Sequence, residues 1–208
     1  MPTGTSSQPE APTVCIVDDE PHIRESLVDL FESVEMKAVS FESAVDFLER
    51  WDHTRAGCIL LDVQMPVLTG LDLQEKLLLA GSTMPIIFMT GQNDVPISVR
   101  ALKAGAADFL VKPFKTTALV SAADAAIRKD AELRSAVISR REALACLSSL
   151  TPREREVLGL VCEGLMNKQI AFALGISEIM VKMHRGRMMR KMEVRSVAEL
   201  VRKHDLTL

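Results

Sequence analysis

Short apolar runs alternate with longer amphipathic segments through the first 130 residues of the chain. Short runs bounded by turn-forming residues are typical of buried strands, whereas apolar positions spaced by three and four are typical of helices. The expected strands are Thr13–Val17, Ala38–Phe41, Gly57–Leu61, Pro85–Met89 and Ala107–Val111, and the expected helices are Pro21–Val34, Glu42–Arg50, Gly70–Ala80, Pro96–Ala104 and a helix from Lys115. Five strand–helix units with short loops predict an α/β fold: a doubly wound, five-stranded parallel sheet with helices on both faces.

A long segment without Gly or Pro, Thr116–Leu150, follows the last expected strand and is rich in Ala, Leu, Arg and Glu. These residues favour helix, whereas a flexible linker would contain Gly, Ser and Pro. We therefore expect the last helix to continue outward as a linker, either unbroken or with one break. This assigns residues 1–11 to a disordered tail, 12–130 to a first domain and 131–149 to a helical linker.

Residues 150–208 carry the pattern of a small all-α domain. In the sequence TPRE, Thr151 is the expected N-cap, Pro152 occupies the first helical position and Glu154 is placed to bond back to the cap. Four short helices are expected, in EREVLGLVCEG, NKQIAFALG, ISEIMVKMHRGRMMRKM and SVAELVRKHDL. The other expected caps are Gly164 and Gly175 at helix ends and Ser177 and Ser196 at helix starts.

Charge divides the chain into an acidic front and a basic back. Residues 1–138 carry 12 Lys and Arg against 20 Asp and Glu, a net charge of −8, whereas residues 139–208 carry 13 against 8, a net charge of +5. This division indicates two functions, the second on a polyanion. The four cysteines show no CxxC spacing and read as reduced, buried thiols. The chain has no apolar run of membrane-spanning length and no signal peptide, so we expect a cytoplasmic protein.

Polar side chains stand at the carboxyl ends of four expected strands. Asp18 and Asp19 follow the first strand, Asp62 the third, Thr90 the fourth and Lys112 the fifth. Chemistry in parallel α/β sheets gathers beyond these strand ends, so we expect the side chains to meet. The three carboxylates form a hard oxygen site suited to Mg²⁺, Asp62 is placed to act as a nucleophile, and Lys112 and Thr90 supply donors for phosphoryl oxygens. The alternative is that these acids only cap helices and solvate loops.

Four motifs carry a resemblance to a known family. They are VDDE at 17–20, LDVQMPVLTG at 61–70, MTG at 89–91 and KAGAADFLVKPF at 103–114. In this order they resemble the receiver domain of two-component response regulators, over residues 12–130. The resemblance implies a flavodoxin-like receiver fold, a sensor histidine kinase as phosphoryl donor, and a homodimer formed on phosphorylation.

The resemblance also implies roles for individual residues of the acidic pocket. Asp62 is the phosphoacceptor, and Mg²⁺ is bound by Asp19, Asp62 and the backbone carbonyl of Gln64. Asp18 acts on the metal mostly through water.

Two further positions match the parts of a receiver that respond to phosphorylation. Thr90 is the switch hydroxyl, and Phe109 matches the switch aromatic residue, which is often Tyr or His. Because Phe109 has no polar tip, only a packing change remains open to it. The bond between Lys112 and Pro113 is usually cis in receivers.

The third helix of the back domain has one apolar and one basic face on a helical wheel of Glu178–Met192. Val181, His184, Met188 and Met192 share one face, and Ile179, Lys182, Met183, Gly186 and Arg190 share the opposite face. A Gly inside a helix costs about 1 kcal/mol relative to Ala. Its place on an exposed face indicates that another surface, such as a DNA major groove, comes close there. A merely solvated face is the alternative.

The pattern of residues 150–208 is similar to the helix-turn-helix output domain of the LuxR/FixJ (FixJ/NarL) class, with Glu178–Met192 as recognition helix. The resemblance implies a transcription factor that binds double-stranded promoter DNA and works with RNA polymerase. Met180 stands where the class usually has Thr, which removes a hydroxyl expected to contact a phosphate. The expected DNA contacts are Lys168, Lys182, Met183, Arg185, Gly186, Arg187 and Arg190.

Two other functions compete with a phosphorylation-controlled transcription factor that does not turn over a substrate. A haloacid-dehalogenase-type phosphatase also forms an aspartyl phosphate, but it places a second Asp two residues after its nucleophile, where this chain has Gln64. A quorum sensor would carry a small-molecule pocket with aromatic walls, and this chain has no Tyr and one Trp. Both alternatives therefore fit the residues less well.

Overall fold

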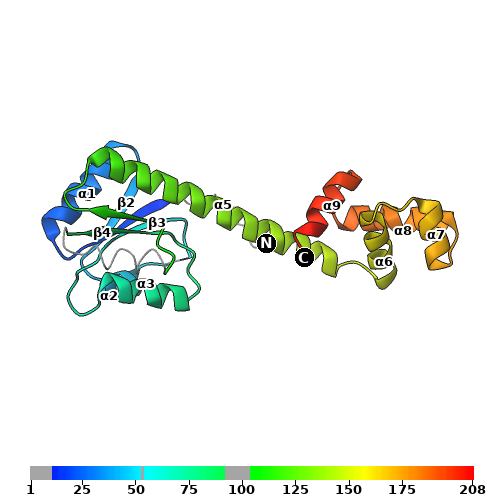
Figure 1. Cartoon of the computed structure of the whole chain (residues 1–208), viewed down its shortest axis with the longest axis horizontal. Helices are drawn as coiled ribbons and strands as arrows, with labels where there is room; N and C mark the ends of the chain where they lie inside the picture. Colours follow the sequence, from blue (N-terminus) through cyan, green and yellow to red (C-terminus); the bar gives the residue numbers. More distant parts are fainter. Residues whose placement is uncertain (1–10, 53, 92–103) are drawn as a thin grey trace, which may run out of the picture. The chain divides into compact units, whose positions relative to one another are not determined.

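The computed structural model describes residues 11–52, 54–91 and 104–208 (Figure 1). The chain divides into two compact units, one ending at Leu133 and the other formed by Arg134–Leu208. The tail expected at residues 1–11 and the helix expected at Pro96–Ala104 lie almost wholly outside the described residues.

The first unit is built on a parallel sheet. Its described elements are β1 (Thr13–Val17), α1 (Pro21–Ser33), β2 (Lys37–Phe41), α2 (Ala44–Arg50), β3 (Gly57–Asp62), α3 (Gly70–Leu79), β4 (Ile86–Thr90), β5 (Asp108–Val111) and α5 (Thr116–Ser148). The five strands lie in the order β2-β1-β3-β4-β5 and every pair is parallel. The doubly wound fold predicted from the sequence is confirmed.

Helices cover both faces of this sheet (Figure 1). Successive strand residues point to opposite faces. Val14 of β1 packs in one cluster with Phe31 of α1 and Leu119 of α5. Val17 of the same strand packs in the other cluster with Leu73 of α3. The sheet is therefore the central layer, and its strand ends are the part left open for a site.

Some element boundaries differ from the sequence prediction. β3 continues by one residue and β4 lies one residue later than predicted, so Asp62 and Thr90 are the last residues of their strands. α2 begins at Ala44 rather than at Glu42, because Ser43 caps the helix by accepting a hydrogen bond from the backbone N–H of Asp46. These strand ends place the carboxylate of Asp62 and the hydroxyl of Thr90 on strand backbone.

The second unit is all α, as expected, and α5 enters it as one helix without a break. Its other helices are α6 (Pro152–Cys162), α7 (Asn167–Leu174), α8 (Glu178–Lys191) and α9 (Val197–Asp205). Thr151 and Glu154 form the expected capping box, and Gly175 ends α7 in the left-handed conformation. The serine caps are also present, because Ser177 and Ser196 accept hydrogen bonds from backbone N–H groups of α8 and α9.

A buried carboxylate ties α5 to the sheet. Asp130 Oδ2 accepts a hydrogen bond of 3.1 Å from the backbone N–H of Gly57, at the start of β3. We expect Asp130→Ala to lower the free energy of unfolding of this unit by about 1–3 kcal/mol, because it leaves a buried donor unsatisfied. Urea unfolding followed by the fluorescence of Trp51, the chain's single Trp, measures the loss.

Asp124→Ala on the same helix is the matched control. It removes an exposed ion pair with Arg128 at 2.8 Å, which contributes under about 1 kcal/mol. Equal losses for the two variants would contradict a special role for Asp130.

Candidate functional sites

The ends of β1 and β3 lie side by side where the strand order reverses, which is where α/β sheets form a crevice. Asp18 follows β1 and Asp62 ends β3. Lys112, which follows β5, reaches both: its Nζ lies 2.8 Å from Asp18 Oδ2 and 2.8 Å from Asp62 Oδ1. One ammonium group therefore bridges two carboxylates that the sequence brings from different strands.

Backbone groups hold both carboxylates in place. Asp18 Oδ1 accepts a hydrogen bond of 2.9 Å from the N–H of Glu20, and Asp62 Oδ2 accepts one of 2.8 Å from the N–H of Gln64. Gly70, the first residue of α3, also shapes the turn, because a Cβ there would lie 2.3 Å from the backbone oxygen of Asp62. Only glycine lets the start of α3 pass so close to the end of β3.

Burial and the ion pairs together shift the pKa values of Asp62 and Lys112. Burial raises the pKa of the Asp62 carboxyl above its ordinary value, and the hydrogen bond and charge of Lys112 oppose that shift only in part. Burial alone would lower the pKa of Lys112, but its hydrogen bonds with Asp18 and Asp62 outweigh burial and raise it. The ammonium form of Lys112 is therefore the form that this site stabilises.

Asp62 and Lys112 line a pocket of about 300 Å³, whose other lining residues are Asp19, Glu20, Gln64, Thr90 and Gly91. The Thr90 hydroxyl is almost fully buried and donates to the carbonyl of Gly91 at 3.4 Å. The pocket therefore combines a carboxylate, an ammonium group and a hydroxyl around one space.

The expected cluster of three carboxylates is not assembled as such. Within residues 11–52, 54–91 and 104–208, no three acidic, His or Cys side chains form a group that could hold a metal ion. Asp18 accepts hydrogen bonds on both of its carboxylate oxygens, one of them from Lys112, so it is turned to that ammonium group. Asp19, Asp62 and Gln64 line the same pocket, and their oxygens are the kind of ligand that Mg²⁺ prefers.

The remaining receiver positions lie in β5 and just after it. Phe109 in β5 is the register partner of Phe88 in β4 and is half-buried against the core cluster shared with α2 and α3. The peptide bond between Lys112 and Pro113 is cis, as expected.

In the second unit, α8 has the two faces that the helical wheel predicted. Val181, Met188 and Met192 are fully buried. Lys182, Gly186, Arg187 and Arg190 are exposed, as is Lys168 on α7. Beyond the adjoining residues and backbone of its own helix, a Cβ added at Gly186 would meet no described atom within 4 Å, so internal packing does not require glycine there.

Two polar contacts that the sequence reasoning did not foresee hold α8 against its neighbours. Lys191 Nζ donates to Glu154 Oε2 of α6 at 2.7 Å, and Arg185 donates to Asn167 Oδ1 of α7 at 3.0 Å. The capping-box motif marked Glu154, but no spacing rule pairs it with a residue 37 positions later. Arg185, an expected DNA contact, is half-buried and engaged with α7.

Two family models together match most of the chain. The model "Response regulator receiver domain" matches residues 14–124, and the model "Bacterial regulatory proteins, luxR family" matches residues 148–204. The chain belongs to the response-regulator family.

Relatives of this response regulator are similar to it over nearly the whole chain. Nodulation protein W of Bradyrhizobium diazoefficiens is 43% identical over 96% of this chain and 89% of its own length. Transcriptional regulatory protein FixJ of Azorhizobium caulinodans is 42% identical, over 93% of this chain and 92% of its own length. A solved structure of the response regulator StyR is 44% identical with a TM-score of 0.84, and covers 94% of this chain and 98% of that chain.

These matches settle the class of function. This response regulator is a transcriptional regulator with a receiver and a LuxR-type DNA-binding domain, and its family does not consist of substrate-turnover enzymes. The phosphatase and quorum-sensor alternatives are thereby excluded. None of the helices that the structure describes has both the length and the apolar character needed to cross a membrane.

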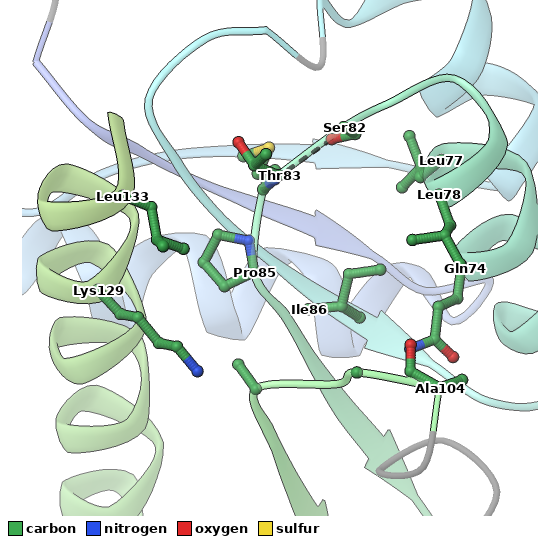
Figure 2. A pocket seen from close by; sticks show the side chains of 13 residues that line it. Gln74, Leu77, Leu78, Ser82, Thr83, Pro85, Ile86, Ala104, Lys129 and Leu133 are labelled. Atoms are coloured by element: carbon green, nitrogen blue, oxygen red, sulfur yellow. Dashed lines mark hydrogen bonds between the residues drawn. The ribbon is translucent and has the colours of Figure 1, made fainter. Parts of the chain in front are cut away.

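The receiver has a second pocket, of about 270 Å³ (Figure 2). Leu77 and Leu78 of α3 stand on one side, Lys129 and Leu133 of α5 on the other, and Pro85 stands just before β4. Because Thr90 ends that same strand, the two pockets lie at opposite ends of the sheet. The residues expected to handle a phosphoryl group are all at the other end.

Proposed function

We propose that this response regulator accepts a phosphoryl group on Asp62 from a sensor histidine kinase, with Mg²⁺ as cofactor, in the cytoplasm. Phosphorylation promotes homodimerisation through residues 12–130, and residues 150–208 then bind promoter DNA and work with RNA polymerase. Residues 131–149 act as the helical linker. The pairing of Lys112 with both Asp18 and Asp62 supports this proposal most, because it places an ammonium group at the expected phosphoacceptor.

The chain itself supplies the nucleophile and two hydrogen-bond donors for the transfer. A carboxylate oxygen of Asp62 attacks the phosphorus of a phosphohistidine, an O–P bond forms, and the P–N bond to the kinase histidine breaks. The transferred phosphoryl group carries negative charge. Its oxygens can therefore accept strong hydrogen bonds from the ammonium group of Lys112 and the hydroxyl of Thr90. Both groups line the pocket that Asp62 faces.

A Mg²⁺ ion fits the oxygen donors of this pocket. Asp19, Asp62 and the backbone carbonyl of Gln64 would hold it, with Asp18 acting through water. When bound, the ion neutralises charge on the carboxylates and on the phosphoryl group. Lys112 supplies part of this neutralisation in the chain itself, because it is already paired with two carboxylates.

Phosphorylation should strengthen dimerisation. We assign the contact to the surface of residues 96–128, part of which lies outside the described residues. Its described part includes β5, an edge strand of the sheet on which Val111 is exposed. Thr90 and Lys112 move toward the phosphoryl group, and Phe109 repacks into the space that Thr90 leaves. This is a shift of population, so the unphosphorylated protein should dimerise weakly.

Sedimentation at matched protein concentrations, with and without acetyl phosphate and Mg²⁺, measures the change. We expect a larger dimer fraction with the phosphodonor, and no response in an Asp62→Asn control. Equal association of the native chain in both conditions would refute phosphorylation-driven dimerisation.

The DNA contacts divide into base readers and phosphate holders. Lys182 lies in the half of α8 nearest its N-terminus, the end that usually enters the groove, and Arg190 lies two turns later. If Lys182 reads a guanine edge, Lys182→Ala should cost about 1–3 kcal/mol on the specific duplex and little on a scrambled one. The proposed DNA-binding face is completed by Met183, Gly186 and Arg187 of α8 and by Lys168 of α7. Arg185, also an expected DNA contact, donates a hydrogen bond to Asn167 of α7.

Arg190→Ala is the matched variant for a phosphate contact. It should weaken binding to specific and scrambled duplexes alike and reduce the salt slope by about 0.9. Titrations at several salt concentrations separate the two roles. Equal weakening of both duplexes by Lys182→Ala would show that Lys182 is no base reader.

A further inference from the structure

The exposed face of α8 carries an apolar stripe formed by Ile179, Met183 and Gly186. These residues are spaced by four and three, which aligns them along one face of the helix. The side chain of Ile179 is 79% exposed and that of Met183 is 40% exposed. Single exposed apolar side chains are common, but an aligned pair that continues into an exposed glycine forms a surface.

Packing inside the unit does not account for this stripe. The opposite face of α8 packs into the core of the unit, and Val181 and Met188 on that face are fully buried. The space around Gly186 is open, so a surface outside the described chain can approach α8 closely there. Lys182 lies beside the stripe and is also exposed, which indicates that the approaching surface is negatively charged.

One surface combines an apolar feature with negative charge. The major groove of DNA carries phosphates along its edges, and the 5-methyl group of thymine is the apolar feature on its floor. A branched aliphatic side chain near the groove-entering end of the helix would bury that methyl group. Ile179 is the second residue of α8, so it lies at that end.

We propose that Ile179 reads the 5-methyl group of thymine. Because Ile is branched at Cβ, it holds one strongly preferred rotamer in a helix and contacts a methyl group with little loss of freedom. Met183 is unbranched and adapts to the neighbouring base step. The inference rests on the proposed DNA-binding face and names the base feature that this face recognises.

Deoxyuridine tests the inference, because it pairs as thymine does and lacks only the methyl group. The probe is a duplex that the phosphorylated full-length protein selects from a randomised library. It is compared with copies of that duplex in which one thymidine at a time is replaced by deoxyuridine. We expect about fourfold weaker binding at one position of each half-site, the value of one buried methyl group. Ile179→Ala should bind the thymine and uracil duplexes equally.

Two variants serve as controls. Ile179→Val keeps the branch at Cβ and should keep most of the discrimination. Phe172→Ala removes a side chain on α7 that is 92% exposed and lies off the stripe, so its discrimination should equal that of the native protein. Comparing both duplexes with both proteins cancels any effect of uracil on DNA shape.

The outcomes separate this inference from the proposed function. If no duplex is selected, the proposed DNA binding itself is wrong. If a duplex is selected but no uracil substitution weakens binding, only the reading of thymine is overturned. If Ile179→Ala keeps the discrimination and instead lowers transcription by purified RNA polymerase, the stripe contacts protein and the inference is wrong.

Discussion

Asp62→Asn is expected to abolish phosphorylation of the chain. The amide lacks the anionic oxygen that attacks phosphorus, while its size and shape preserve the fold around it. Incubation with acetyl phosphate and Mg²⁺, followed by intact-mass measurement, should show one added phosphoryl group on the native chain and none on the variant. Asp108→Asn is the matched control, because this exposed carboxylate lies at the other end of the sheet and should not affect labelling.

Removing the metal tests the same site independently. EDTA should stop labelling of the native chain, and an excess of Mg²⁺ should restore it, because the oxygen donors of Asp19, Asp62 and Gln64 line the pocket. A phosphoryl group on any residue other than Asp62 would contradict the assignment. Full labelling in EDTA would contradict the metal requirement alone.

The fold could be predicted from the sequence because its signals are local. Apolar runs marked all five strands to within one residue at each end, and Thr151, Ser177 and Ser196 marked helix starts by their capping chemistry. The motifs at the strand ends also located the acidic pocket, because parallel strands bring their carboxyl ends to one edge.

The arrangement inside the pocket could not be predicted in the same way. The sequence places Asp18, Asp19 and Asp62 at two strand ends, which favours a cluster of three carboxylates. The structure instead turns Asp18 toward Lys112, a residue 94 positions away, and leaves Asp19 at the pocket wall. Side-chain direction depends on rotamers and on long-range partners, which strand periodicity does not report.

The same limit applies to the basic domain. The helical wheel separated the faces of α8 correctly, because burial follows the helical period. It could not distinguish basic side chains that bind DNA from those that hold the domain together. Lys191 and Arg185 belong to the α8 surface by sequence, yet their partners are Glu154 on α6 and Asn167 on α7.

Lys112→Ala is expected to destabilise the receiver by about 3 kcal/mol, because it leaves two buried carboxylates without their cation. The Asp18 side chain is fully buried, and the Lys112 side chain is only 22% exposed, so water replaces little of the lost pairing. Two carboxylates about 4 Å apart repel by about 4 kcal/mol at an effective dielectric near 20. Urea unfolding followed by Trp51 fluorescence measures the loss.

Three comparisons assign that loss to the ion pairs. Lys115→Ala removes an exposed ammonium group three residues away and should cost under about 0.5 kcal/mol. Adding Asp18→Asn to Lys112→Ala removes one of the two opposed charges and should recover more than half of the stability. Mg²⁺ should also stabilise the Lys112→Ala protein more than the native one, because a cation then replaces the missing ammonium group. If Lys112→Ala is as stable as Lys115→Ala, the ion pairs do not hold the pocket together, and Lys112 serves only the phosphoryl group.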